Sequence, residues 1–268
     1  LFWLLLIAGN GLAAHRLGFQ LGRTHSAALL VGVAYAASEN LLREVNLHHA
    51  PQALSPWAPL YLAAILRATE DRGQKRDVLS AALWMALSGI TYWYTALFLA
   101  IGTAPLLWIR RQQWRRFAQA AGLSALLAAP FLLPYALHLG DLPLASLSQH
   151  PSPSNSSAAL DLLPPGQAFI TEHGNDLALP FRATPLDTSN RISLVLLLAV
   201  GLSIRRGGRK IFLAVAAIGA LFALGPYLRW GSEPLFLGDT PIALPFRWLS
   251  AASPIFERLT WPERWGIL

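Results

Sequence analysis

The stretch LFWLLLIAGNGLAAHRLG, residues 1–18, decides the fold class. It is apolar from its first residue, and its one charged side chain, Arg16, comes near its end. A signal peptide carries its positive residues before its apolar run, so the order found here indicates a membrane helix. Because residue 1 is Leu and the helix is already under way there, we expect a fragment that lacks both ends. The small residues of GNGLAA are then packing contacts between helices.

The composition favours lipid as the main solvent of the surface. Of the 268 residues, 54% are hydrophobic and only 13% are charged, whereas soluble domains carry about 25% charged residues. The chain has no cysteine, which excludes disulfides, thiolate metal sites and cysteine nucleophiles. The net charge of +7 would suit nucleic acid only if the basic residues gathered on one accessible face. They flank apolar segments instead, so we expect no nucleic-acid partner.

The apolar segments predict an all-α fold, because helices satisfy their own backbone polar groups in lipid. We expect a polytopic membrane helix bundle of about eight transmembrane segments with outer-face loops, the shorter segments being tilted or buried in the bundle. The segments run approximately over 1–15, 26–42, 54–68, 78–92, 94–109, 117–138, 191–204 and 211–226.

These segments divide the chain into four expected regions. Residues 1–138 form a transmembrane bundle of about six segments. Residues 139–190 form an extracytoplasmic loop, and 191–226 hold two further segments. Residues 227–268 form an extracytoplasmic interfacial segment that leads into a truncated next helix.

The basic residues cluster in alternate loops, as the positive-inside rule requires of a multi-pass protein. We therefore place these loops in the cytoplasm and the loops around 43–55, 139–190 and 227–268 outside. The cytoplasmic set holds fourteen of the 21 Lys and Arg residues, namely Arg16, Arg23, Arg67, Arg72, Lys75, Arg76, Arg110, Arg111, Arg115, Arg116, Arg205, Arg206, Arg209 and Lys210.

The first candidate site is SENLLREVNLHHAPQ, residues 38–52, at the outer end of the second segment. Ionisable residues at such a position are candidates for function. On a helix, Glu39 and Arg43 share one face and can form an ion pair, which is the purely structural alternative. His48 and His49 suit hydrogen bonds to a substrate hydroxyl or phosphate better than they suit zinc, since neighbouring residues point apart.

Two further groups are candidates for substrate binding. SGITYWYTAL, residues 88–97, places Tyr92 in an aromatic belt or, alternatively, against a sugar ring. The stretch from 224 to 268 carries Arg229, Arg247, Arg258 and Arg264 among tryptophans. Arginine side chains can bind a phosphate through two hydrogen bonds, so these residues are candidates for phosphate binding. Alternatively, the arginines form ion pairs with Glu257 and Glu263 in an interfacial helix.

No cofactor is indicated. The expected outer loops contain no D-x-D or E-x-D pair, and the adjacent acids Glu70 and Asp71 fall in a basic loop. A metal and sugar-phosphate site therefore lacks its usual carboxylates here. A divalent cation is left open for the full-length protein.

The order of these motifs resembles bacterial polytopic membrane glycosyltransferases of the GT-C class. The resemblance rests on NLHHAPQALSPWAPLYL (46–62), SGITYWYTALFLAI (88–101) and ALGPYLRWG with IALPFRWLSAASPIFERLTWPERWGIL (223–231 and 242–268). It covers nearly the whole chain, although each motif is short. His48 and His49 take the place of the family's histidine after a helix, and Arg258 and Arg264 that of its arginines. The spacing in ERLTWPER departs from the family's tighter pattern.

The resemblance implies transfer of a hexosyl or pentosyl group from a polyprenyl-phosphate-linked donor. The acceptor would be a glycan, lipid or protein on the outer face of the bacterial inner membrane. The family's acidic catalytic residue lies in a first outer loop that would precede this chain, so no position here inherits it. A transporter or flippase of lipid-linked saccharides and a non-catalytic envelope-assembly protein remain as alternatives.

Overall fold

The computed structural model describes residues 1–22, 24–46, 48–137, 217–218, 221, 227–230 and 233–252. The chain divides into two compact units, Leu1–Leu142 and Pro143–Leu268, which we call unit 1 and unit 2. The described part is predominantly helical, as the apolar segments predict. The expected loop over 139–190, the segment over 191–204 and most of the segment over 211–226 lie outside the described residues.

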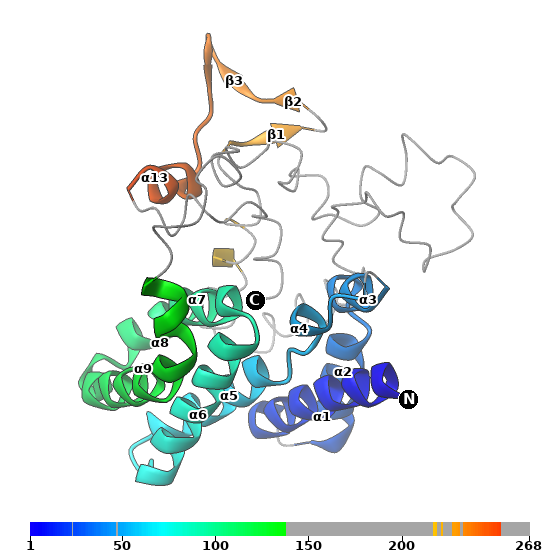
Figure 1. Cartoon of the computed structure of the whole chain (residues 1–268), viewed down its shortest axis with the longest axis vertical. Helices are drawn as coiled ribbons and strands as arrows, with labels where there is room; N and C mark the ends of the chain where they lie inside the picture. The colour runs from blue at the N-terminus through cyan, green and yellow to red at the C-terminus, as the bar shows by residue number, and fades with distance from the viewer. Residues whose placement is uncertain are drawn as a thin grey trace. The chain divides into compact units, whose positions relative to one another are not determined.

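Unit 1 is a set of helices joined by short turns (Figure 1). Its elements are α1 (Phe2–Gly22), α2 (His25–Ala36), α3 (Glu39–Asn46), α4 (Ala50–Ala53), α5 (Trp57–Ala68), α6 (Lys75–Thr91), α7 (Trp93–Gly102), α8 (Ala104–Ile109), the 3-10 helix η1 (Arg111–Gln113) and α9 (Trp114–Leu137).

Two of the expected continuous segments are broken. The segment predicted over 26–42 ends as α2 at Ala36 and resumes as α3 at Glu39. The segment predicted over 94–109 is interrupted at Thr103, where Pro105 follows in the first turn of α8. Proline has no N–H and suits the first turn of a helix, whereas in a helix interior it removes a backbone hydrogen bond. At Thr103 apolar residues continue on both sides, so hydropathy alone does not reveal the break, whereas at Ala37 the polar residues Ser38, Glu39 and Asn40 follow it.

The helices of unit 1 run between two ends. At one end Nδ2 of Asn10 donates to the carbonyl oxygen of Ala53, and Nε1 of Trp57 donates to Oγ1 of Thr91. We call this the α3–α4 end. At the other end, Arg67 of α5 donates to Gln20 of α1 and to Asp77 of α6. We call it the arginine end, because Arg110 and Arg116 also reach α5 there.

Small residues make the helix contacts of unit 1. Gly11 and Gly32 bring α1 and α2 together, since a Cβ added at Gly32 would lie 2.7 Å from the carbonyl oxygen of Gly11. Alanines dominate the buried apolar positions, as in Ala28, Ala64 and Ala81. Such small-residue contacts are typical of helices that pack in membranes. The expectation that GNGLAA packs against a neighbouring helix is confirmed.

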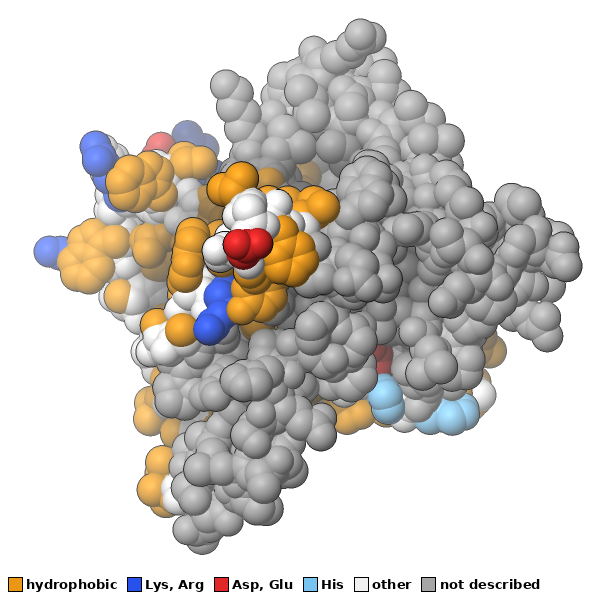
Figure 2. All heavy atoms as spheres, turned by 90° about the horizontal axis from the view of Figure 1, so that it is seen from above, with side chains coloured by type: hydrophobic (Ala, Val, Ile, Leu, Met, Phe, Trp, Pro, Cys, Tyr) orange, Lys and Arg blue, Asp and Glu red, His pale blue; other side chains and the backbone are white. Residues whose placement is uncertain are grey.

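Many large apolar side chains of unit 1, in contrast, are exposed, although Phe98, Leu41, Ile65 and Leu99 are buried. Figure 2 shows apolar side chains covering much of the described surface on the face in view. Leu1, Leu12, Trp108, Leu126 and Leu137 are each at least 70% exposed. Of the described helices, one is long and apolar enough to cross a membrane by length and composition, over Arg111–Pro134. Shorter apolar helices run over His25–Ala36 and Trp93–Ile109.

The described residues of unit 2 form two short hairpins and a helix. Strand β1 (Arg229–Trp230) pairs antiparallel with β2 (Glu233–Pro234), and β3 (Phe236–Leu237) pairs with β4 (Thr240–Pro241). Gly238 has φ 64° in the second turn, a conformation that glycine adopts without strain. Helix α13 (Pro245–Ala252) buries Phe246. The hairpins were not expected within the interfacial segment.

Candidate functional site

The candidate site is a carboxylate–imidazole pair at the α3–α4 end of unit 1. Oε2 of Glu44, near the end of α3, lies 2.8 Å from Nδ1 of His49. The Glu44 side chain is 3% exposed, whereas the His49 side chain is 45% exposed. The backbone N–H of His49 also donates to the carbonyl oxygen of Glu44 at 2.9 Å. A buried acid therefore fixes an accessible imidazole.

The segment after His49 is held by polar side chains from α1 and α2. Asn10 is 1% exposed, donates through Nδ2 to the carbonyl oxygen of Ala53 at 2.8 Å and accepts the N–H of Ser55 at 3.1 Å. The hydroxyl of Tyr35 donates to the carbonyl oxygen of Ser55 at 2.9 Å. A buried amide without these partners would cost about 1–3 kcal/mol. These bonds fix where α4 lies and hence where His49, its N-cap residue, is presented.

His48 occupies a left-handed backbone conformation with φ 57°. For a residue with a Cβ, this conformation costs about 1–2 kcal/mol. It reverses the chain between α3 and α4, and the His48 ring lies 5.8 Å from the ring of Trp3 by centroid. The turn therefore presents two neighbouring imidazoles in different directions, so they do not form a paired metal site.

The pair has a definite chemical capacity. A carboxylate that accepts from Nδ1 fixes the neutral imidazole as the Nδ1–H tautomer, whose acceptor lone pair is on Nε2. An imidazole held in this way is suited to accept a proton from a hydroxyl, or to donate one when protonated. The arrangement resembles the orientation of a catalytic histidine by an acid in hydrolases, although a pair alone does not define a reaction.

The structure brings some of the sequence-predicted site residues together. His48 and His49 adjoin Glu44 at the α3–α4 end. Glu39 and Arg43 lie on α3 as predicted, but their side chains lie outside the described part, and their ion pair stays a prediction. Arg229 lies in β1 with its side chain outside the described part, and Arg258 and Arg264 lie beyond the described residues.

Tyr92 lies at the one-residue turn between α6 and α7. Its N–H donates to the carbonyl oxygen of Ser88, and its ring packs edge-on against Tyr94 with centroids 5.0 Å apart. The ring of Trp93 also packs against Tyr94, with ring centroids 4.0 Å apart. Both the belt and the sugar-stacking interpretation remain open for this aromatic cluster, because each needs a half-buried ring at the end of a helix.

Sequence reasoning missed the pairing of Glu44 with His49. It placed Glu44 within the group but paired Glu39 with Arg43, using the spacing of one continuous helix. The spacing of five residues from 44 to 49 crosses the end of α3, where helical periodicity gives no guidance. Asn10 was missed too, although an amide inside an apolar run was the available signal.

At the arginine end of unit 1, arginine side chains bind backbone carbonyl oxygens near the end of α5. Nη1 of Arg116 donates to the carbonyl oxygens of Ala68 and Glu70, and Nη1 of Arg110 donates to that of Leu66. These carbonyls belong to the last turn of α5 and the residues after it, which have no helical partners of their own. Arginines at a helix C-terminus also stabilise its dipole.

Asp77 accepts a hydrogen bond from Arg67 at this end. It lies just before the apolar run expected over 78–92. Burial raises the pKa of its carboxyl, but the hydrogen bonds from the Gln74 backbone and from Arg67 and the charges of Arg67 and Arg76 outweigh burial, so that the pKa is lowered. Asp77 also accepts the Gln74 N–H at 3.0 Å within a capping box at the start of α6.

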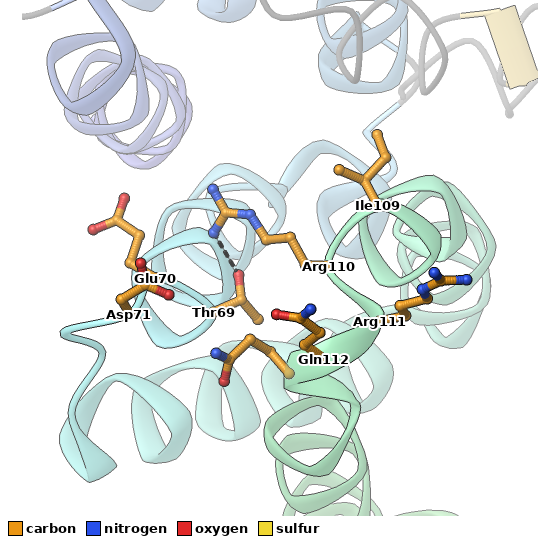
Figure 3. Close-up of a pocket in the computed structure, with 8 residues that line it drawn as sticks. Thr69, Glu70, Asp71, Ile109, Arg110, Arg111 and Gln112 are labelled. Carbon is orange, nitrogen blue, oxygen red and sulfur yellow. Dashed lines mark hydrogen bonds between the residues drawn. The ribbon is translucent and has the colours of Figure 1, made fainter.

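An open hollow of about 570 Å³ lies beside these arginines (Figure 3). Figure 3 shows Arg110 reaching from the end of α8 toward Thr69, with Glu70 and Asp71 beyond it and Arg111 pointing the other way. The lining is formed by Thr69, Glu70, Asp71, Ile109, Arg110, Arg111, Gln112 and Gln113.

Within the described part of the chain, no group of three or more His, Asp or Glu side chains is arranged to hold a metal ion. Comparison of the sequence and fold with protein-family models, curated proteins and solved structures finds no match.

Proposed function

We propose that the chain belongs to an integral membrane glycosyltransferase of the GT-C class, in which the α3–α4 end carries part of the transfer site. The observation that carries the proposal is the contact of buried Glu44 with exposed His49. It lies in the motif NLHHAPQ, on which much of the sequence resemblance rests. The donor is a polyprenyl-phosphate-linked sugar, and the acceptor is a hydroxyl of a glycan, lipid or protein.

The surface of unit 1 supports the membrane part of this proposal. In water, each large apolar side chain left exposed forgoes about 1.5–3 kcal/mol of burial free energy. Leu5, Leu12 and Leu126 are between 64% and 70% exposed, while Asn10 and Glu44 are buried. This distribution suits lipid on the outside. With the segments expected over 191–226, the bundle has about eight spans in a bacterial inner membrane.

The proposed chemistry at His49 follows from the orientation of its ring. The acceptor oxygen attacks the anomeric carbon, and the bond from that carbon to the phosphate oxygen breaks. The polyprenyl phosphate leaves with the bonding electron pair. His49 hydrogen-bonds the acceptor hydroxyl through Nε2 and receives its proton, while buried Glu44 stabilises the imidazolium that forms.

The phosphate of the donor requires cations nearby. His48 follows α3 and Arg43 belongs to it, and both are proposed to hydrogen-bond this phosphate. Arg229, Arg258 and Arg264 belong to unit 2, and their role in phosphate binding stays a prediction from the sequence. Arginine forks match phosphate geometry. Tyr92 is proposed to stack on the sugar ring.

Transport of a lipid-linked saccharide receives less support. A transport path presents polar groups to a substrate near the bilayer midplane. Several buried polar side chains of unit 1 bond to backbone carbonyl oxygens instead: Ser88 to Trp84 and Thr103 to Leu99, both within their own helices. Asn10 bonds to Ala53 across helices. These groups serve packing.

A transfer assay tests the proposal. Full-length protein in lipid nanodiscs is given a panel of polyprenyl-phosphate sugars and acceptor extracts, and sugar transfer is measured for wild type and for His49→Ala. We expect transfer to fall by about 100-fold or more, the usual contribution of a general base. His25→Ala is the matched control, because His25 is an exposed histidine at the start of α2 whose ring contacts Phe19 and His15. Equal activity of His49→Ala and wild type contradicts the assignment.

A further inference from the structure

We propose that the hollow at the arginine end binds a phospholipid headgroup that carries both a phosphate and a primary ammonium group. The hollow is distinct from the Glu44–His49 site, because it is formed by the loop after α5 and by the α8–η1 junction. The inference rests on the membrane placement in the proposed function, and not on glycosyl transfer. The volume of the hollow, about 570 Å³, falls within the usual range for small-molecule sites.

Arg110 is fixed in position for an anion. Its Nη1 donates to the carbonyl oxygen of Leu66 at 2.9 Å and to Oγ1 of Thr69 at 2.8 Å. Thr69 is itself held, since its hydroxyl donates to the carbonyl oxygen of Ile65 at 2.8 Å. Among the described residues, Nη2 and Nε of Arg110 have no acceptor. These two nitrogens form one edge of the guanidinium fork, the geometry that binds phosphate in a bidentate manner.

Two carboxylates lie across the hollow from Arg110. Glu70 and Asp71 are exposed, and their side chains make no hydrogen bond or ion pair with the described residues. A simple anion would meet repulsion from both. A ligand with a positive end as well as a negative end satisfies both sides of the hollow, with its phosphate at Arg110 and its ammonium at Glu70 and Asp71.

The surroundings of the hollow match the position of a lipid headgroup. Ile109 lines it and is 61% exposed, and the neighbouring Trp108 is 79% exposed. Trp114 begins α9 just beyond, with Arg115 over its ring at 5.9 Å. Tryptophan and arginine concentrate where hydrocarbon meets headgroups. Acyl chains can therefore lie along the apolar surface while the headgroup enters the hollow.

A headgroup series tests this inference. Full-length protein is purified with a mixture of phosphatidylethanolamine, its mono- and dimethylated forms, phosphatidylcholine and phosphatidylglycerol, and retained lipid is measured by native mass spectrometry. Each methyl group removes an N–H donor while the phosphate stays. We expect retention to fall by about tenfold from phosphatidylethanolamine to phosphatidylcholine, as loss of charge-assisted hydrogen bonds predicts. Equal retention of these two lipids, or preference for phosphatidylglycerol, overturns the inference.

Variants separate the two halves of the headgroup. Glu70→Gln with Asp71→Asn abolishes the preference for phosphatidylethanolamine but retains phosphate binding; a persisting preference overturns the inference. Arg110→Lys lowers retention of all phospholipids, while Arg16→Ala, at an exposed arginine of α1 that does not line the hollow, changes neither the preference nor the retention. The acidic variants leave the backbone contacts of Glu70 intact, so they test the inference even if Arg110→Lys fails to fold. A protein that inserts into nanodiscs without headgroup preference contradicts only this inference, whereas failure to insert contradicts the proposed function.

Discussion

Oε2 of Glu44 lies 2.8 Å from Nδ1 of His49, and the two side chains differ sharply in exposure, at 3% and 45%. The contact spans the turn that contains His48, so it ties the end of α3 to the start of α4. A carboxylate buried to this degree needs partners, because an ion without them costs several kcal/mol in a protein interior. The pair therefore has both a structural and a chemical consequence.

The structural consequence is a measurable coupling between the two residues. His49→Ala removes a partner from buried Glu44 and is expected to lower the free energy of unfolding by about 1–3 kcal/mol. Glu44→Gln removes the charge that needs that partner. In a double-mutant cycle the two changes should therefore be less than additive, with a coupling energy of about 0.5–3 kcal/mol. Additive losses, measured by thermal unfolding in detergent, would show that the pair is not formed.

The contact of α1 with α2 predicts opposite effects of two glycine substitutions. In Gly32→Ala the new Cβ would lie 2.7 Å from the carbonyl oxygen of Gly11, so one helix must move. We expect a loss of about 1–3 kcal/mol, as for overpacked cores. Gly9→Ala is the control in α1, because its Cβ meets nothing within 4 Å, and we expect a gain of up to about 1 kcal/mol from helix propensity. Similar thermal midpoints for both variants would contradict this packing.

The lowered pKa of Asp77 predicts a pH dependence of stability. A carboxyl whose pKa is lower in the folded than in the unfolded protein stabilises the fold above its unfolded pKa, about 3.9. This stabilisation is lost as the pH falls through the folded pKa. Asp77→Asn should therefore lower the thermal midpoint at pH 7 and reduce the drop in midpoint from pH 5 toward pH 2. An unchanged acid profile in the variant would argue against the contacts of Asp77 with Arg67 and Gln74.

The sequence predicts the helices of unit 1 better than the turns between them. Apolar runs locate α5, α6 and α9 within a few residues, because length and hydropathy are local properties. The break at Thr103 lies inside an apolar run, and the polar residues 38–40 after Ala37 were included in the segment expected over 26–42, so both breaks were missed. Arg67, Arg110 and Arg116, from two of the expected basic loops, make contacts at one end of unit 1. The placement of that end in the cytoplasm stays a prediction.

The candidate site was only partly predictable for a physical reason. His48 and His49 stand out in the sequence because ionisable residues are few in it, with 13% charged residues and 7 His. Glu44 is buried, and the bonds from Asn10 and Tyr35 join α1 and α2 to the segment around Ser55. These bonds join residues 20 positions apart, for Tyr35 and Ser55, and 43 positions apart, for Asn10 and Ala53. Spacing rules for a single helix do not reach that far.

The absence of cysteine makes the membrane orientation directly measurable. Single substitutions at two exposed positions, Ala37→Cys after α2 and Gln112→Cys in η1, mark the two ends of unit 1. With an impermeant maleimide on intact bacterial spheroplasts, we expect labelling at residue 37 alone, and labelling at residue 112 only after lysis. This follows from the excess of Lys and Arg in loops on the cytoplasmic side. Equal labelling of both residues on intact spheroplasts would contradict the orientation.

The most direct test of the proposed function is where a polyprenyl phosphate binds. A photoactivatable polyprenyl-phosphate analogue is crosslinked to full-length protein in nanodiscs, and the labelled peptides are mapped by mass spectrometry. The account predicts labelling at the α3–α4 end, within residues 36–62. Unlabelled polyprenyl phosphate should compete with this labelling, and His25→Ala should leave it unchanged. Specific labelling confined to the arginine end, or no competable labelling anywhere, would contradict it.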